Sequence, residues 1–304
     1  SFSTSITGFK NPFITNFEKR KEANLGIRSK FVYETKLPFP LQWVNGVEVQ
    51  RGDYTIDSSG NNKGVSDGKM VRDLVVARQQ FFFSQLSAHP FEFIQVQAGI
   101  SVNSFNYAIE RTVGLPASGN KKIAFDAQVL PRFALTIQPI KAVAFYGQLS
   151  KGYSSPTLAE IRPSAGGLYA GLQAEYGLNK ELGMKLSADQ GRFFFSATVF
   201  QFDLKDAIVR QVNASGAEYF VNAGTAVQKG IEAELSWLLL NRPKGKFIQL
   251  LKMTQALTIN DFRFGTYTVA NISHAGKKMT GVPKDVYNSQ SKLLFSSIIS
   301  ATSI

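Results

Sequence analysis

The chain has 304 residues, no cysteine, 44% hydrophobic residues and a formal net charge of +12. This length allows one large all-β unit or two ordinary domains. The absence of cysteine excludes a disulfide framework and a thiolate metal site, and the scattered basic residues argue against nucleic-acid binding. The positive charge has two interpretations of equal weight, namely solvated loops or attraction of anionic ligands and lipopolysaccharide phosphates.

Hydropathy excludes a helical membrane protein. The longest apolar runs, such as residues 142–146 and 238–240, are far shorter than the roughly 18 residues that a spanning helix needs. A membrane barrel is still possible, because its strands need only about 10 residues of alternating apolar character.

Turn signals divide the chain into extended runs. Short signals lie at residues 36–38, 87–90, 138–139, 189–191 and 242–245. Between them lie longer polar connections at residues 53–69, 108–122, 152–171, 213–218 and 264–283. Short turns that alternate with long loops are typical of a transmembrane up-and-down barrel. The architecture of a soluble sandwich does not account for this alternation.

The extended runs have the period of strands. In residues 193–204, Phe200 and Phe202 alternate with Gln201 and Asp203, so that the strand has an apolar and a polar face near its end. About 12 such strands are predicted, many of them longer than a globular strand. The predicted fold class is therefore all-β, a transmembrane antiparallel up-and-down β-barrel.

Two runs of aromatic residues, Phe81 to Phe83 and Phe193 to Phe195, lie beside predicted turns. We interpret them as part of an aromatic girdle at the membrane boundary. Ordinary packing within the sheet is the alternative.

Three motifs occur in order along the chain: SKGYSSPTLAEIRPS at residues 150–164, AEYGLNKELG at residues 174–183 and NAGTAVQKGIE at residues 222–232. Together they resemble the barrel of TonB-dependent outer-membrane receptors. Weaker similarity at residues 11–20, 26–34, 46–52 and 129–137 resembles the branch that takes up ferric siderophores or ferric citrate.

The resemblance implies a barrel that closes at about 22 strands, so the chain is expected to be a partial barrel without the plug domain. We expect residues 1–286 to form this partial barrel, and residues 287–304 to be a divergent or truncated tail. The expected location is the bacterial outer membrane.

The function implied by the resemblance is energy-coupled uptake of a ferric chelate, a siderophore or ferric citrate, into the periplasm. The implied partners are the chelate, the inner-membrane protein TonB acting through the missing plug region, and outer-membrane lipid with lipopolysaccharide. No cofactor and no enzymatic activity are expected. The alternative function is a passive porin-like or adhesin barrel without a plug.

In this family the outer loops and the plug together bind the chelate, so basic and aromatic loop residues are the candidate ligand-binding residues. Cations would meet chelate oxygens through charge-assisted hydrogen bonds. The alternative for Arg162 is an ion pair with Glu160 or with neighbouring strands that only shapes the loop. The predicted ligand-binding residues are Arg111, Lys121, Lys122, Tyr153, Arg162, Tyr169, Arg210 and His274.

No catalytic or metal site is predicted. The family resemblance implies that Glu175, Asn179, Glu181 and Glu232 face the lumen of the barrel and bond to the plug, and nothing in their spacing indicates a general acid and base. The two histidines, His89 and His274, do not suffice for a metal centre. Phosphate-binding glycine loops are also missing.

Overall fold

The computed structural model describes residues 2–12, 16–36, 38–63, 65–68, 70–114, 121–163, 168, 171–212, 218–222, 224–242, 247–269 and 272–295. These residues are almost entirely strands. The long strands are β1 (Phe2–Pro12), β2 (Asn16–Thr35), β3 (Leu41–Asn62), β5 (Val71–Phe91), β6 (Ile94–Val113), β7 (Lys121–Ile140), β8 (Val143–Ser154), β9 (Glu175–Ala188), β10 (Phe193–Lys205), β13 (Thr225–Asn241), β14 (Ile248–Phe264) and β17 (Asp285–Phe295). The short elements are β4 (Val65–Ser66), α1 (Leu158–Ile161), η1 (Asp189–Gly191), β11 (Ile208–Val212), β12 (Glu218–Asn222), β15 (Thr268–Val269) and β16 (Ile272–Ser273).

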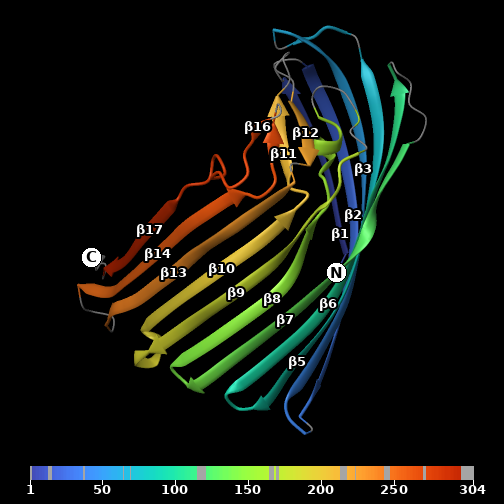
Figure 1. Cartoon of the computed structure of the whole chain (residues 1–304). Coiled ribbons are helices and arrows are strands. Elements are labelled where there is room, and N and C mark those ends of the chain that lie inside the picture. The colour runs from blue at the N-terminus through green and yellow to red at the C-terminus, as the bar shows by residue number, and fades with distance from the viewer. Residues whose placement is uncertain are drawn as a thin grey trace, which may run out of the picture.

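Thirteen strands form one sheet, and twelve of them follow one another side by side, since β4 pairs only with β3. Every pairing between these neighbours is antiparallel, and β1 and β17 form the two edges. Figure 1 shows the sheet as a strongly curved wall. The predicted fold class and the predicted number of strands are confirmed for the described part of the chain.

Short and long connections alternate as predicted, although several boundaries differ. The strand β3 continues to Asn62 and β6 to Val113, so residues 53–62 and 108–113 are strand and not loop. Their inward side chains, such as Ile56 and Ile109, are buried, which keeps the backbone paired beyond the expected end. At the opposite end, β5 and β7 continue through Pro90 and Pro139, and the turns follow a few residues later.

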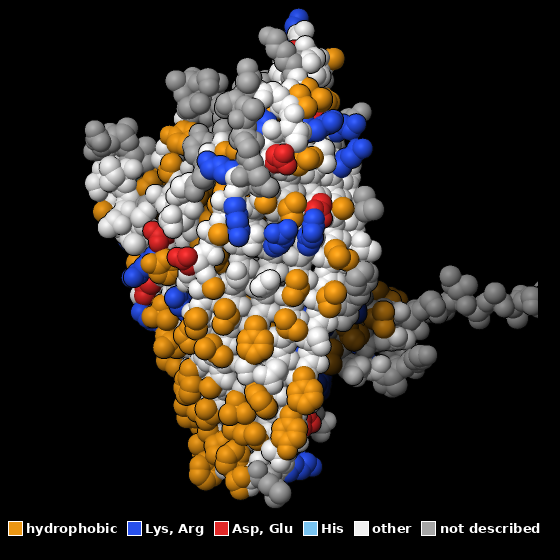
Figure 2. All heavy atoms as spheres, turned by 90° about the vertical axis from the view of Figure 1, so that its right-hand side faces the viewer, with side chains coloured by type: hydrophobic (Ala, Val, Ile, Leu, Met, Phe, Trp, Pro, Cys, Tyr) orange, Lys and Arg blue, Asp and Glu red, His pale blue; other side chains and the backbone are white. Residues whose placement is uncertain are grey.

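The outward face of the sheet is apolar in the half next to the short turns. Figure 2 shows this half as a continuous hydrophobic surface, with Lys and Arg side chains above it. Such a band matches the hydrocarbon layer of a membrane, because lipid tails replace the protein core on this face. Large side chains exposed in the band include Ile27, Phe31, Trp43, Val47, Phe82, Ile100, Phe133, Phe145, Leu182, Val199, Ile231 and Trp237.

The inward face is polar and hydrogen-bonded. The Tyr146 hydroxyl lies 2.6 Å from the Thr198 hydroxyl, and Arg132 donates to Gln148 over 2.6 Å. Glycine makes room for rings on this face, because a Cβ on Gly46 would collide with the Phe83 ring. The register also turns Asn179 and Glu181 inward, on the side of β9 opposite to exposed Leu182.

The two phenylalanine runs divide between the faces. Phe82 is exposed on the outward face, whereas Phe81 and Phe83 point inward and their ring centroids lie 5.7 Å apart. On the outward face, the Phe193 ring meets the Trp237 ring edge to face, at 6.1 Å. Alternate members of each run therefore serve the membrane boundary and the packing of the inner face.

The strand β17 crosses the expected boundary at residue 286. It runs from Asp285 to Phe295 and pairs with β14 throughout, with Tyr287 opposite Leu257. Residues 296–304 lie outside the described residues. The divergent tail over residues 287–304 stays a prediction, although its first part is a paired strand.

Candidate functional site

In the connection between β8 and β9, the described residues 155–163, 168 and 171–174 lie against the inner face of the sheet; we call them the covering segment (Figure 1). It contains α1, which begins with a capping box. The Thr157 side chain accepts a hydrogen bond from the Glu160 backbone N–H, and the Glu160 carboxylate accepts from the Thr157 N–H over 2.6 Å. These bonds satisfy amide groups that a helix start otherwise leaves free.

The covering segment closes a hydrophobic core on the inner wall. Ile161 is fully buried with Ile56, Val75 and Ile109 from three neighbouring strands. The Tyr107 hydroxyl donates to the Pro156 carbonyl oxygen over 3.2 Å, and Pro156 is itself fully buried. The segment is therefore packed onto the wall along most of its described length.

Arg162 follows α1 directly and enters a buried ion network. Its Nε donates to Asp73 over 2.6 Å and its Nη1 to Glu18 over 2.8 Å, while its Nη2 donates to the Ser58 hydroxyl over 2.8 Å. Arg162 is 3% exposed, Glu18 1% and Asp73 0%. Buried charges cost several kcal/mol each unless they are fully paired, and here each has a partner.

The network extends to two further arginines. Arg111 donates to both oxygens of Asp73, over 2.7 and 3.1 Å, and Arg20 donates to Glu18 over 2.5 Å. Asp73 thus accepts from two guanidinium groups that approach from β6 and from the covering segment. The arrangement holds five elements together, namely β2, β3, β5, β6 and the covering segment.

A second set of bonds ties the end of the covering segment to the β11–β12 hairpin. Asn222 accepts from the Gln173 N–H over 2.8 Å and donates to the Gln173 carbonyl over 2.9 Å. The Glu175 carboxylate accepts from the Ile208 N–H over 2.6 Å. The hairpin and the covering segment therefore form one connected unit on the inner side of the wall.

The other predicted ligand residues are spread along the end of the sheet that carries the long connections, here called the loop-side rim. Lys121 and Lys122 are exposed at the start of β7, Lys121 on the face of buried Ile109 and Lys122 on the opposite face. Tyr153 lies next to the last residue of β8, and its buried hydroxyl has no partner among the described residues. Tyr169 lies outside the described residues.

Two predicted residues have partners in the loops themselves. Arg210 on β11 forms an exposed ion pair with Glu218 on β12. His274 follows β16, and its ring centroid lies 5.5 Å from that of Tyr267. Of the seven predicted residues that the structure describes, only Arg111 and Arg162 share a partner, Asp73.

The partners of Arg162 were not predicted from the sequence. Glu18, Ser58 and Asp73 sit at inward positions of strands, where polar residues are common, and no local motif distinguishes them. The alternative interpretation of Arg162 did include pairing with neighbouring strands, and the structure has this arrangement. Glu160, the other predicted partner, caps α1 instead.

A recess of about 270 Å³ lies on the inner wall beside the covering segment. Its lining includes Tyr107, Tyr54, Asn24, Gln50 and Gln79, so its groups are mostly neutral hydrogen-bonding side chains and aromatic rings. The Tyr54 hydroxyl donates to Asn24 over 3.3 Å. The lining also includes Arg51, which pairs with Asp53. The neutral groups can orient a polar ligand or a polypeptide surface through hydrogen bonds.

Within the described residues, no cluster of three or more His, Cys, Asp or Glu side chains has the geometry to hold a metal ion. The same part of the chain contains no helix that is both long and apolar enough to cross a membrane.

The family model described as "TonB dependent receptor-like, beta-barrel" matches residues 3–296. The chain therefore belongs to the TonB-dependent receptors and contains part of their β-barrel domain. These receptors are proteins of the bacterial outer membrane that serve in transport, and the apolar outward band agrees with this location. A search of curated proteins found no match.

Solved structures support the same fold. The ferric citrate transporter FecA in its unliganded form has a TM-score of 0.69 at 10% identity, covering 95% of this chain and 42% of FecA. The ferripyoverdine receptor of Pseudomonas aeruginosa has a TM-score of 0.67 at 16% identity, covering 98% of this chain and 41% of that receptor. The copper transporter OprC has a TM-score of 0.64 at 14% identity, covering 82% of this chain and 39% of OprC. The chain thus spans less than half the length of these structures.

Proposed function

We propose that this chain is part of the wall of a receptor that binds a ferric chelate, either a siderophore or ferric citrate. In this proposal the complete receptor moves the chelate into the periplasm with energy supplied through TonB. The chain binds and guides its cargo and carries out no chemical step on it. The main observation in support is the covering segment, an outer loop that buried Arg162 anchors against the inner wall, on the side where a chelate would pass.

The chemistry of the available side chains favours an anionic chelate over a bare metal ion. The chain has a net charge of +12, no cysteine, four methionines and two histidines. Copper prefers sulfur and imidazole ligands, whereas the oxygens of citrate or hydroxamate are matched by arginine and lysine. Copper uptake, the activity for which OprC is named, is therefore not the function proposed for this chain.

We propose two roles for the predicted ligand residues. Lys121 and Arg210 contact the chelate directly, and Lys122, Tyr153, Tyr169 and His274 are retained as further contacts. Arg111 and Arg162 act as positioning residues, because their guanidinium groups are buried on Asp73 and hold the covering segment in place.

Uptake assays in iron-starved cells test the function. Cells that produce the receptor are supplied with radioactive iron as the citrate, hydroxamate or catecholate complex, in the presence and absence of TonB. The expected result is uptake of one chelate class that stops without TonB. Uptake that continues unchanged without TonB would favour the passive barrel and overturn the proposal.

Equilibrium binding of the transported chelate tests the residues. Replacement of Lys121 and Arg210 by Gln is expected to weaken the affinity several-fold, because each loses a charge-assisted hydrogen bond. Lys252, a basic residue on β14 remote from the loop-side rim, gives the matched control Lys252→Gln. If Lys121→Gln, Arg210→Gln and Lys252→Gln bound the chelate with equal affinity, direct contact of Lys121 and Arg210 with the chelate would be excluded.

A further inference from the structure

A pocket of about 520 Å³ lies on the inner face of the wall, near the loop-side rim. The β11–β12 hairpin forms one side of it with Ile208 and Val209. The strands form the floor, and the register places their pocket-lining side chains on the inward face, because Phe202 pairs with inward Asn179. The floor residues include Glu175, Phe202, Leu204, Ala226, Gln228 and Phe264.

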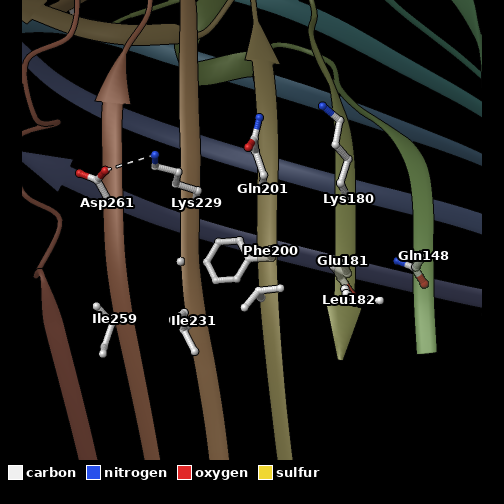
Figure 3. A pocket seen from close by; sticks show the side chains of 12 residues that line it. Gln148, Lys180, Glu181, Leu182, Phe200, Gln201, Lys229, Ile231, Ile259 and Asp261 are labelled. Carbon is white, nitrogen blue, oxygen red and sulfur yellow. Dashed lines mark ion pairs between the residues drawn. The ribbon is translucent and has the colours of Figure 1, made fainter. Parts of the chain in front are cut away.

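Glycines on the neighbouring strands leave room for the aromatic rings of this floor. Gly177 and Gly152 are paired on β9 and β8, and a Cβ on Gly177 would come within 2.6 Å of the Phe202 ring. The same device recurs lower on the wall. Figure 3 shows the Phe200 ring directed toward β13, where a Cβ on Gly230 would lie 2.8 Å from the ring. The rings therefore lie over bare backbone and present apolar faces to the lumen.

Among the described residues that line the pocket, Glu175 is the one charged residue. One of its carboxylate oxygens accepts from the Ile208 N–H over 2.6 Å, and it forms no ion pair within the described part of the chain. Burial raises the pKa of this carboxyl. On the outward face of the same strands charges are paired instead, as in the contact of 3.7 Å between Lys229 and Asp261 (Figure 3). Glu175 thus keeps a charge that no cation of the described chain neutralises.

A single carboxylate beside aromatic ring faces is suited to an organic cation. The carboxylate accepts a charge-assisted hydrogen bond from an ammonium group, and the ring faces attract the same positive charge. We propose that this pocket binds a primary ammonium group carried on a hydrocarbon arm or ring of the cargo. The ammonium group pairs with the second oxygen of Glu175, and the hydrocarbon part lies over Phe202 and Phe264.

This inference rests on the proposed function and narrows its cargo. The residues proposed to contact the iron-binding oxygens, Lys121 and Arg210, are cations, whereas the pocket offers an anion and apolar surface. A cargo that uses both has an oxygen-rich metal centre and a cationic arm. Ferric citrate carries only carboxylates and hydroxyls, so the inference assigns the receptor to siderophores with an amine-bearing arm.

Binding of 2-phenylethylammonium to the complete receptor in lipid nanodiscs tests the pocket without any chelate. The measurement is a titration by saturation-transfer NMR. The variant Glu175→Gln is expected to bind this probe about tenfold more weakly, because it loses one charge-assisted hydrogen bond. Its amide oxygen can still accept from the Ile208 N–H, so the hairpin keeps its anchor. The matched control is Glu22→Gln, which removes an inward carboxylate of β2 outside the pocket and should leave binding unchanged.

A neutral probe separates the role of the charge from a collapse of the pocket. The alcohol 2-phenylethanol has the same ring without a cation, and it should bind the unchanged receptor and Glu175→Gln equally weakly. Equal binding of 2-phenylethylammonium to the unchanged receptor and Glu175→Gln would overturn the proposal. A loss of both probes in Glu175→Gln would also overturn it, because the effect would then not depend on charge.

A pair of chelates tests the consequence for the cargo. Desferrioxamine B is a trishydroxamate that ends in a primary amine, and its N-acetyl derivative lacks the cation. The iron complex of the amine form should displace 2-phenylethylammonium at a concentration about tenfold lower than that of the acetylated form. Equal displacement would overturn the inference.

The uptake assay distinguishes this inference from the proposed function. Preferred uptake of ferric citrate that depends on TonB would overturn the cationic cargo and leave the proposed function intact. No TonB-dependent uptake of any chelate would overturn the proposed function and the cargo assignment that rests on it, and the probe titration would still measure the charge preference of the pocket.

Discussion

Two parts of the wall follow the same alternation of side chains but stabilise their inner faces differently. Under the covering segment, β3, β5 and β6 bury Ile56, Val75 and Ile109 completely. Across β9, β10, β13 and β14 most inward side chains are half-buried and some, such as Glu232, are exposed, and contacts such as the one between the Phe200 and Phe262 rings at 6.3 Å join them. Because lipid covers the outer face of both parts, dense packing arises where a loop is laid over the inner face.

The strongest test of this difference is the substitution Asp73→Asn. It removes the charge that two buried guanidinium groups share, and breaking a buried pair typically costs about 3 to 5 kcal/mol. The measurement is the free energy of unfolding in detergent, together with protease cleavage in the covering segment, which should increase.

The control for Asp73→Asn is Asp57→Asn on the adjacent strand β3. Asp57 pairs with Arg72 at the surface, where the two side chains are 21% and 40% exposed. An exposed pair contributes up to about 1 kcal/mol. If both variants lost the same stability, the buried network would have no special role.

The substitution Ile161→Ala tests the hydrophobic contribution of the covering segment. A buried Ile replaced by Ala costs about 2 to 5 kcal/mol, because it leaves a cavity. Ile231→Ala is the partner experiment in the less densely packed part, since Ile231 is 47% exposed on the outward face. Ile231→Ala should lower the free energy of unfolding much less than Ile161→Ala does. A larger loss in Ile231→Ala would contradict the comparison.

The substitution Tyr107→Phe removes one hydrogen bond and leaves the ring. The Pro156 carbonyl oxygen loses its donor, and we expect a loss of about 1 kcal/mol. Protease sensitivity of the covering segment should rise slightly in the same variant. Tyr33→Phe, at an exposed position on β2, serves as the control and should leave both measurements unchanged.

The smallest effect is expected for Lys180→Gln. Lys180 and Asp203 form an exposed pair between β9 and β10, so the free energy of unfolding should change by less than about 1 kcal/mol. The difference should shrink further at high salt, because salt screens exposed charges. A large, salt-independent loss would show that this part of the wall depends on ion pairs as the covered part does.

The strands were predictable because their signal is local. Alternation in residues 193–204 and the spacing of turns fixed the fold class and the number of strands. Their ends were less predictable: residues 53–62 are polar enough for a loop, and they remain a strand because Ile56 is covered by a segment more than 100 residues away.

The ion network shows why the site was only partly predictable. The Thr157 to Glu160 capping box has a readable motif, and it occurs as such. Arg162, by contrast, meets Asp73 and Glu18 across separations of 89 and 144 residues. No periodicity in one sequence relates such positions, so the family motif indicated that Arg162 matters without indicating its partners.

The bonds of Arg162 have a mechanical consequence for the wall. They join the connection between β8 and β9 to β2, β3 and β5. The covering segment therefore links strands that are not neighbours in the curved sheet. These bonds restrain the curvature of the sheet. A motion that moved β8 away from β2 and β5 would therefore first have to break the ion pairs of Arg162 with Asp73 and Glu18.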